Sequence, residues 1–347
     1  MRRIQIYYML LFLLGYSCES VYIADLDKVD EVMVVDARLV YGEQNQIFLY
    51  KSQGFNEQDN FKPVNAIVQL QDDRGETLNT IQDKPGVYIL NASLDPFRKY
   101  RLHIIASGET YVSAYEPVPG EPRIDSAYIE YFEKWVHPGG ETDAGSFIKR
   151  TGQQFYVDIH EDQASYYRFT SRLVLQYTFP FDTVIGTPVR LLKYCWKTIY
   201  PHELFNLAAP SEYTSSPDII KYPAEFMGYY DGYLEQNERG EGWIYMMHQY
   251  RISESSYKYY NDLNSQLGPK GKIFDPLYVQ ARNNLTCTSD PEKLILGNFD
   301  ISRHREHRYL VKLNRGSGIN TIRKIEQYHD IPERGIRPIY KPYFWED

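Results

Sequence analysis

The chain has 347 residues and carries 38 Lys and Arg against 46 Asp and Glu, a formal net charge of −8. This length suffices for about two domains and for a core that needs no metal or disulfide framework. The acidic balance argues against a nucleic-acid-binding protein, which would present a basic surface to phosphates. A charged fraction of 24% beside 43% hydrophobic residues excludes global disorder. Tyrosine is unusually frequent, with 33 Tyr beside 16 Phe and 4 Trp, and it is a residue enriched in strands and at binding surfaces.

Residues 1–17 are predicted to be a lipoprotein signal peptide. Two arginines precede an apolar run over residues 4–14, which is too short to span a bilayer as a helix but fits a secretory signal. The following Gly-Tyr-Ser-Cys resembles a bacterial lipoprotein box, with Gly15 where that box has Leu. The resemblance implies that Cys18 carries acyl chains such as palmitate and anchors the protein to a membrane. The alternative is a plain signal peptide with an incidental Cys18.

The other two cysteines are Cys195 and Cys287. An even pair in an exported chain favours a disulfide between them. Such a bridge would close a long loop and stabilise the fold by about 4–5 kcal/mol in the loop-entropy picture. The alternative is two buried thiols that never meet.

Residues 18–30 are predicted to be an acidic tether, and residues 31–118 a β-sandwich. Short alternating segments, such as residues 100–104, are separated there by turns that contain Gly and Asp. The expected strands are Glu31–Val40, Gln46–Lys51, Ala66–Gln71, Gly86–Asn91, Tyr100–Ala106 and Thr110–Tyr115. The order of segments 66–75 and 83–88 resembles immunoglobulin-like domains of exported Bacteroidota proteins.

Residues 119–123 are predicted to be a linker, because the prolines and the glycine around them cannot continue a strand ladder. Residues 124–347 are expected to form a larger β-rich domain. The expected strands are Ser126–Val136, Gln154–His160, Tyr166–Thr178, Val189–Tyr200 and Gly242–Ile252, and residues 206–225 have the composition of a loop.

One segment of this domain is predicted to be an amphipathic helix. Ser253 can cap its first turn, and apolar residues follow at positions 257, 260, 263 and 267 with helical spacing. Gly268 then provides a stop. We expect the tyrosines of this helix to pack in the core rather than to contact a ligand.

Several short elements together carry a family resemblance. They are Cys195-Trp196, Ser253 to Tyr260, Phe274-Asp275-Pro276, Asn284-Leu285 before Cys287, and Leu296-Gly297-x-Phe299. In this order they resemble domain-of-unknown-function family 4249, a group of Bacteroidota outer-membrane lipoproteins. The elements are turn and packing residues, so they indicate a fold and not an activity. Gly297, inside an apolar run, predicts a bulge or a close backbone approach.

The sequence contains no nucleophile elbow, no zinc-protease motif and no phosphate-binding glycine loop. His304 and His307 lie in an HREHR segment, residues 304–308. The arginines around them would repel a cation, and we expect a solvated basic segment there. The acidic residues between Asp158 and Asp162 are expected to mark a strand end. We therefore expect no catalytic site, cofactor or metal.

The main candidates for ligand or partner contact are aromatic. They are Tyr222, Phe226, Tyr229, Tyr230 and Tyr233. Such a segment can stack sugar rings or anchor an interface, and the alternative is an aromatic-packed strand pair in the core. The family resemblance implies an outer-membrane lipoprotein that is an accessory or ligand-binding partner of a TonB-dependent transporter. The alternative function is a stand-alone surface lipoprotein that binds a glycan or a peptide through the Tyr-rich segment.

Overall fold

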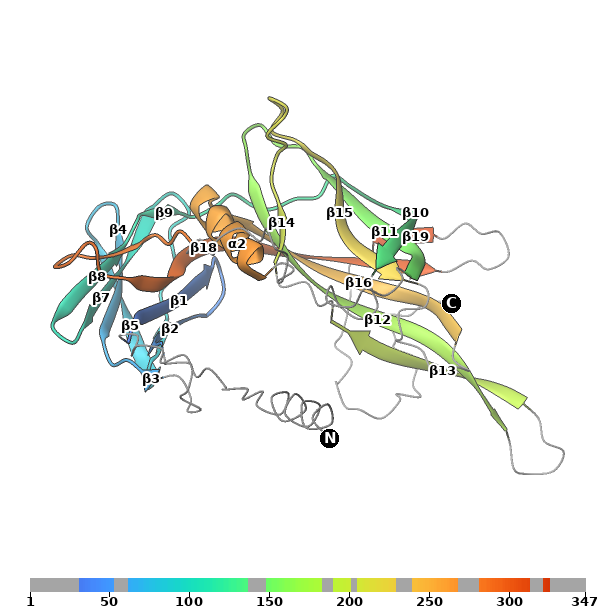
Figure 1. The fold of residues 1–347 in the computed structure, drawn as a ribbon, viewed down its shortest axis with the longest axis horizontal. Coiled ribbons are helices and arrows are strands. Elements are labelled where there is room, and N and C mark those ends of the chain that lie inside the picture. The colour runs from blue at the N-terminus through green and yellow to red at the C-terminus, as the bar shows by residue number, and fades with distance from the viewer. Residues whose placement is uncertain are drawn as a thin grey trace, which may run out of the picture.

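The computed structural model describes residues 31–52, 62–136, 148–182, 190–200, 205–228, 239–267, 281–312 and 321–324. Within these ranges the protein is mainly β with a single helix, as the sequence predicted (Figure 1). The strands form a mixed sheet of sixteen strands and a separate sheet of three. The predicted signal peptide and tether lie outside the described residues.

The N-terminal body consists mostly of short antiparallel strands. They are β1 (Met33–Val40), β2 (Asn45–Lys51), β3 (Lys62–Pro63), β4 (Ile67–Asp72), β5 (Thr77–Lys84), β6 (Val87–Leu90), β7 (Lys99–Ala106), β8 (Glu109–Ser113) and β9 (Glu116–Pro117). Buried and more exposed side chains alternate along β1, β4 and β7, because successive side chains of a strand point to opposite faces. All six strands expected before residue 118 are present, with ends that shift by at most two residues.

Two strands from late in the chain complete this body. β17 (Leu285–Cys287) pairs with β8, and the first part of β18 (Ile295–Lys312) pairs in parallel with β1, from Met33 opposite Ile295 to Val40 opposite Ser302. Residues of the predicted second domain therefore belong to the sheet of the predicted first one. The large sheet therefore contains strands from both sides of the predicted linker, residues 119–123.

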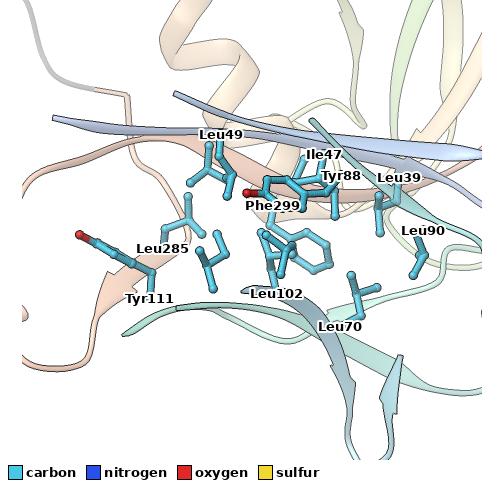
Figure 2. Packing of buried hydrophobic residues seen from close by; sticks show 14 of the residues in the cluster. Leu39, Ile47, Leu49, Leu70, Tyr88, Leu90, Leu102, Tyr111, Leu285 and Phe299 are labelled. Carbon is cyan, nitrogen blue, oxygen red and sulfur yellow. The ribbon is translucent and has the colours of Figure 1, made fainter. Parts of the chain in front are cut away.

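The core of the N-terminal body lies between two layers of strands in a sandwich-like arrangement. Figure 2 shows Leu39, Ile47 and Leu49 on the side of the blue strands and Leu70 and Leu102 on the opposite side. Phe299 of β18 is fully buried in the same cluster. The finer assignment to an immunoglobulin-like sandwich stays a prediction.

The second body combines the three-stranded sheet with the far end of the large sheet. The three strands are β10 (Ser126–Val136), β11 (Ile148–Ile159) and β15 (Ile219–Gly228). The large sheet contributes β12 (Tyr166–Asp182), β13 (Arg190–Ile199), β14 (Asn206–Ala208), β16 (Arg239–Ile252), the rest of β18, and β19 (Thr321–Lys324). The expectation of a loop over residues 206–225 holds for residues 209–218, whereas the two ends of that range are strands β14 and β15. Pro223 lies in β15 next to a register shift against β11, where a proline does not interrupt the ladder.

The large sheet buries side chains on both of its faces in this body. On one face Tyr245 and Tyr309 pack against Phe155 of β11, with ring centroids 4.6 and 5.0 Å apart. On the other face Ile244 and Met246 belong to a smaller buried cluster. This two-sided burial explains why many of the aromatic residues are core residues.

The helix α2 (Glu254–Leu267) lies at the junction of the two bodies (Figure 1). Ser253 Oγ accepts a hydrogen bond from the backbone N–H of Ser256 at 3.2 Å, which confirms the predicted cap. Tyr260 is 3% exposed, and Tyr257 packs on Tyr166 with ring centroids 5.1 Å apart. The predicted apolar face of the helix therefore packs against the sheet at these positions.

Candidate ligand-binding cavity

Of the predicted contact residues, the structure describes Tyr222 and Phe226, and these two side chains lie in different surroundings. Tyr222 stacks on Phe169 with ring centroids 5.5 Å apart, and its hydroxyl donates to the carbonyl of Leu207 at 3.0 Å. Tyr222 also contacts Asn206, so it is held inside the second body. The remaining predicted residues, Tyr229, Tyr230 and Tyr233, lie outside the described residues.

Phe226 belongs instead to a small aromatic patch on the three-stranded sheet. Its ring meets the ring of Phe132 edge to face, with centroids 6.1 Å apart, and the ammonium of Lys134 lies 5.9 Å from its centroid. Gly152 of β11 pairs with Phe132, and a Cβ at this glycine would meet the carbonyl of Met227 at 2.3 Å. The absence of a side chain at Gly152 lets the backbones of β11 and β15 approach closely at this point. We call Phe132, Lys134 and Phe226 the aromatic patch.

A cavity of about 450 Å³ lies where the two bodies and α2 meet. We call it the junction cavity. Strands β1 and β2 contribute Asp36, Arg38 and Tyr50, whereas α2 contributes Tyr259. Phe205, which precedes β14, closes the other side. The cavity therefore depends on both bodies and has a volume that suits a small ligand.

Aromatic side chains form part of the walls of the junction cavity. Phe205 packs against Tyr260 with ring centroids 5.2 Å apart, and Tyr259 meets Tyr260 edge to face at 5.5 Å. Burial raises the pKa of Tyr50 and of Tyr259, and the nearby Asp36 carboxylate raises both further. Both phenols therefore stay protonated at neutral pH and can donate hydrogen bonds.

One ion pair supplies the charge of the junction cavity. The Nε and Nη2 atoms of Arg38 donate to the two carboxylate oxygens of Asp36, each at 2.8 Å. Burial disfavours the charged guanidinium, but the hydrogen bond to Asp36 and the nearby negative charges, that of Asp36 first, together outweigh this effect and raise the pKa of Arg38. The pair has no net charge, so the cavity suits a neutral polar ligand with an apolar face.

A buried carboxylic acid lies behind the aromatic wall. Asp300 of β18 is fully buried and accepts a hydrogen bond from the hydroxyl of Tyr260 at 3.2 Å. Burial raises the pKa of Asp300. The guanidinium of Arg168 lies 5.5 Å from the Tyr260 ring centroid and 4.3 Å from that of Tyr250. These contacts hold Tyr260 in place beneath the cavity.

Sequence reasoning did not single out Tyr50, Phe205 or Tyr259, which line this cavity. Tyr259 lies outside the predicted apolar face of α2. A large aromatic residue at such a position is the sequence signal from which a ligand contact could have been predicted. Tyr50 and Phe205 are far apart in the sequence and come together only because the two bodies meet.

The HREHR segment is not the solvated basic segment that we expected. It lies inside β18, and His307 is 3% exposed, with Nε2 2.9 Å from Gln249 Oε1. Because side chains alternate along a strand, His304 lies on the opposite face from His307. Within the described ranges no three His, Cys, Asp or Glu side chains come together to hold a metal ion.

The acidic residues from Asp158 to Asp162 mark the end of β11, as predicted. Asp158 accepts hydrogen bonds from the Ser126 hydroxyl at 2.5 Å and from the backbone N–H of Lys221 at 2.7 Å. Glu161 forms an ion pair with Arg251, in which Oε2 lies 3.2 Å from Nη2. These carboxylates connect neighbouring strands.

The predicted disulfide between Cys195 and Cys287 is wrong. Cys287 is a free, buried thiol whose Sγ lies 3.2 Å from Ser289 Oγ. It lies on β17, whereas Cys195 lies on β13, and these two strands are at opposite ends of the strand order of the large sheet. Cys18 lies outside the described residues.

These features define a mainly β protein with a ligand-sized cavity between two bodies that share a strand. The family described as Domain of unknown function (DUF4249) matches residues 19–308. The protein therefore belongs to this family, as the resemblance predicted. No curated protein and no solved structure matches the chain. In the described part of the chain, no helix has the length and apolarity needed to cross a membrane.

Proposed function

We propose that the protein is a non-catalytic outer-membrane lipoprotein that binds a ligand in the junction cavity and is an accessory partner of a TonB-dependent transporter. The observation that carries the binding role is the cavity itself, which combines aromatic walls with a charge-balanced Asp36–Arg38 pair. Aromatic faces and a few polar groups together suit a glycan or a peptide segment. An acylated Cys18 supplies the membrane anchor in this proposal.

The partner role predicts a specific recovery from membranes. Affinity purification of the full-length protein from detergent-solubilised membranes should recover a TonB-dependent barrel, identified by mass spectrometry. A Cys18→Ala variant should leave the membrane fraction and lose the barrel, because the acidic chain has no attraction to anionic headgroups and depends on its acyl chains. Recovery of the wild-type protein with no outer-membrane barrel would contradict the partner role.

The cavity predicts which residues bind the ligand. Tyr50→Ala and Tyr259→Ala should each weaken binding of a glycan or peptide selected from an array by about tenfold, since each removes an aromatic wall and a hydroxyl donor. Isothermal titration calorimetry measures the change. Tyr213→Ala is the matched control, because Tyr213 is 97% exposed and does not line the cavity.

A second candidate function uses the aromatic patch instead. Phe226 meets Phe132 on the three-stranded sheet, and Phe132 is 39% exposed. A stand-alone glycan- or peptide-binding lipoprotein could use these rings as its platform. The same array separates the two functions: loss of binding in Phe226→Ala with unchanged binding in Tyr50→Ala and Tyr259→Ala would favour the patch and contradict the cavity.

A further inference from the structure

The three-stranded sheet has one open edge in the described part of the chain. Its strand order is β10-β11-β15. At the β15 edge the side-chain amide of Asn206 donates to the carbonyl of Ala224 at 2.6 Å, so this edge is partly covered by β14. β10 pairs with β11 along all eleven of its residues, whereas no described strand pairs with its other side. A long strand with unpaired N–H and C=O groups is a template for pairing with another chain.

Large aromatic side chains of β10 are exposed along this edge. Tyr131 is 59% exposed, Trp135 is 62% exposed, and Phe132 is 39% exposed. Ala127 and Ile129 pack against the core of the second body. The side chains of the odd-numbered residues therefore point to that side of the sheet, and Phe132 points to the other side. The edge thus presents apolar surface on both of its faces, and burial of this surface would favour association.

We propose that β10 pairs with β10 of a second copy of this chain, in antiparallel orientation, around a two-fold axis that passes beside Phe132. The axis is perpendicular to the sheet, so the interface is isologous and each contact between different residues occurs twice. The pairing joins two three-stranded sheets into one sheet of six strands. Phe132 of one copy then lies opposite Phe132 of the other, and the aromatic patches of both copies meet on one face.

The charges of β10 select the register of this pairing. The N–H and C=O groups that point to one side of a strand belong to every second residue, so the axis must lie at a residue rather than between two residues. With the axis at Phe132, Glu130 of one copy lies opposite Lys134 of the other. An axis at Glu130, Glu133 or Lys134 would place identical charges opposite each other, which is destabilising. Among axis positions 129–135, only the position of Phe132 brings opposite charges of β10 together.

Glu130 also has an ion-pair partner in its own chain. Its Oε2 atom lies 2.7 Å from Nζ of Lys221, and both side chains are about half exposed. A carboxylate has lone pairs for more than one donor, so Lys134 of the second copy adds to this exposed pair rather than replacing Lys221. In the same register Ile129 lies opposite Trp135 of the second copy, which gives the exposed indole an apolar neighbour.

Charge reversal tests the interface. Sedimentation equilibrium of the full-length protein in density-matched detergent should show a dimer. Lys134→Glu and Glu130→Lys should each raise its dissociation constant by about tenfold or more, because like charges then face each other at two symmetry-related positions. An equimolar mixture of the two variants should recover the wild-type affinity, since opposite charges again meet in the mixed dimer; a misfolded variant could not be rescued in this way. A monomeric wild-type protein, or a mixture no tighter than its components, would overturn the proposal.

Cysteine cross-linking tests the position of the axis. Opposite residues of antiparallel strands have Cα atoms about 4.5–5.5 Å apart, which a disulfide can bridge. Mild oxidation should therefore convert Phe132→Cys into a covalent dimer on a non-reducing gel, above the background of the wild-type protein. The matched control is Tyr128→Cys, an aromatic position on the same face of β10 whose two copies would lie roughly 27 Å apart along the strands. No cross-linking of Phe132→Cys, or equal cross-linking of Tyr128→Cys, would overturn the register.

Discussion

Gly297→Ala should lower the free energy of unfolding by more than about 3 kcal/mol. Gly297 has φ +95°, and a Cβ at this position would meet the carbonyl oxygen of Val35 at 1.8 Å. Val35 is the residue that pairs with Gly297 in the parallel ladder between β1 and β18. The methyl group therefore forces apart the two backbones that connect the N-terminal body to the rest of the chain. Urea denaturation followed by circular dichroism measures the change.

Gly42→Ala is the matched control for this substitution. Gly42 has φ +83°, but no atom lies within 4 Å of the position that its Cβ would take. This variant should lose only the conformational cost of a left-handed residue, about 1 kcal/mol. If both variants lost the same stability, the close approach to Val35 would not be the cause.

A fragment of residues 31–123, the predicted first domain with its linker, should fail to fold alone. It lacks β17 and β18, which contribute buried side chains to the core. These are Leu285, Cys287, Ile295, Phe299 and Ile301. Removal of one large core side chain such as Phe299 costs about 3–5 kcal/mol, and this fragment lacks five buried residues together with the strand partner of β1. We expect poor chemical-shift dispersion in its NMR spectrum and no cooperative thermal transition.

The missing strands can be restored as a control. The same fragment with residues 281–302 fused through a flexible linker should regain a cooperative transition, because these residues contain β17 and the part of β18 that pairs with β1. A folded fragment without them would show that the N-terminal strands form an independent domain.

The strands and the helix that carry strong periodicity could be predicted from the sequence. Strand β7 alternates buried and more exposed residues along its length, and α2 has a capping serine and apolar residues at helical spacing. In both cases the pattern is local and follows from burial of one face. The close approach at Gly297 was also visible, because a glycine within an apolar strand usually marks a bulge or a neighbouring backbone.

The polar strands and the junction cavity could not be predicted in this way. Strand β5 is mostly exposed and so lacks a buried face, and the HREHR segment of β18 is a strand because of its partner β16. The junction cavity arises from pairings between distant segments: Tyr50 meets Tyr259 only because β18 holds the two bodies together. A single sequence gives no signal for such pairings.

The shared strand also has a consequence for the order in which the protein folds. The hydroxyl of Ser302 in β18 bonds to the carbonyl of Leu39 in β1, across 263 residues of sequence. During the proposed export from the N-terminus, β1 would reach the far side of the membrane long before its partner. Until β18 follows, β1 would have an unpaired edge, and such an edge can pair with other chains and lead to aggregation. The protein should therefore depend on holding chaperones until nearly all of its chain has crossed.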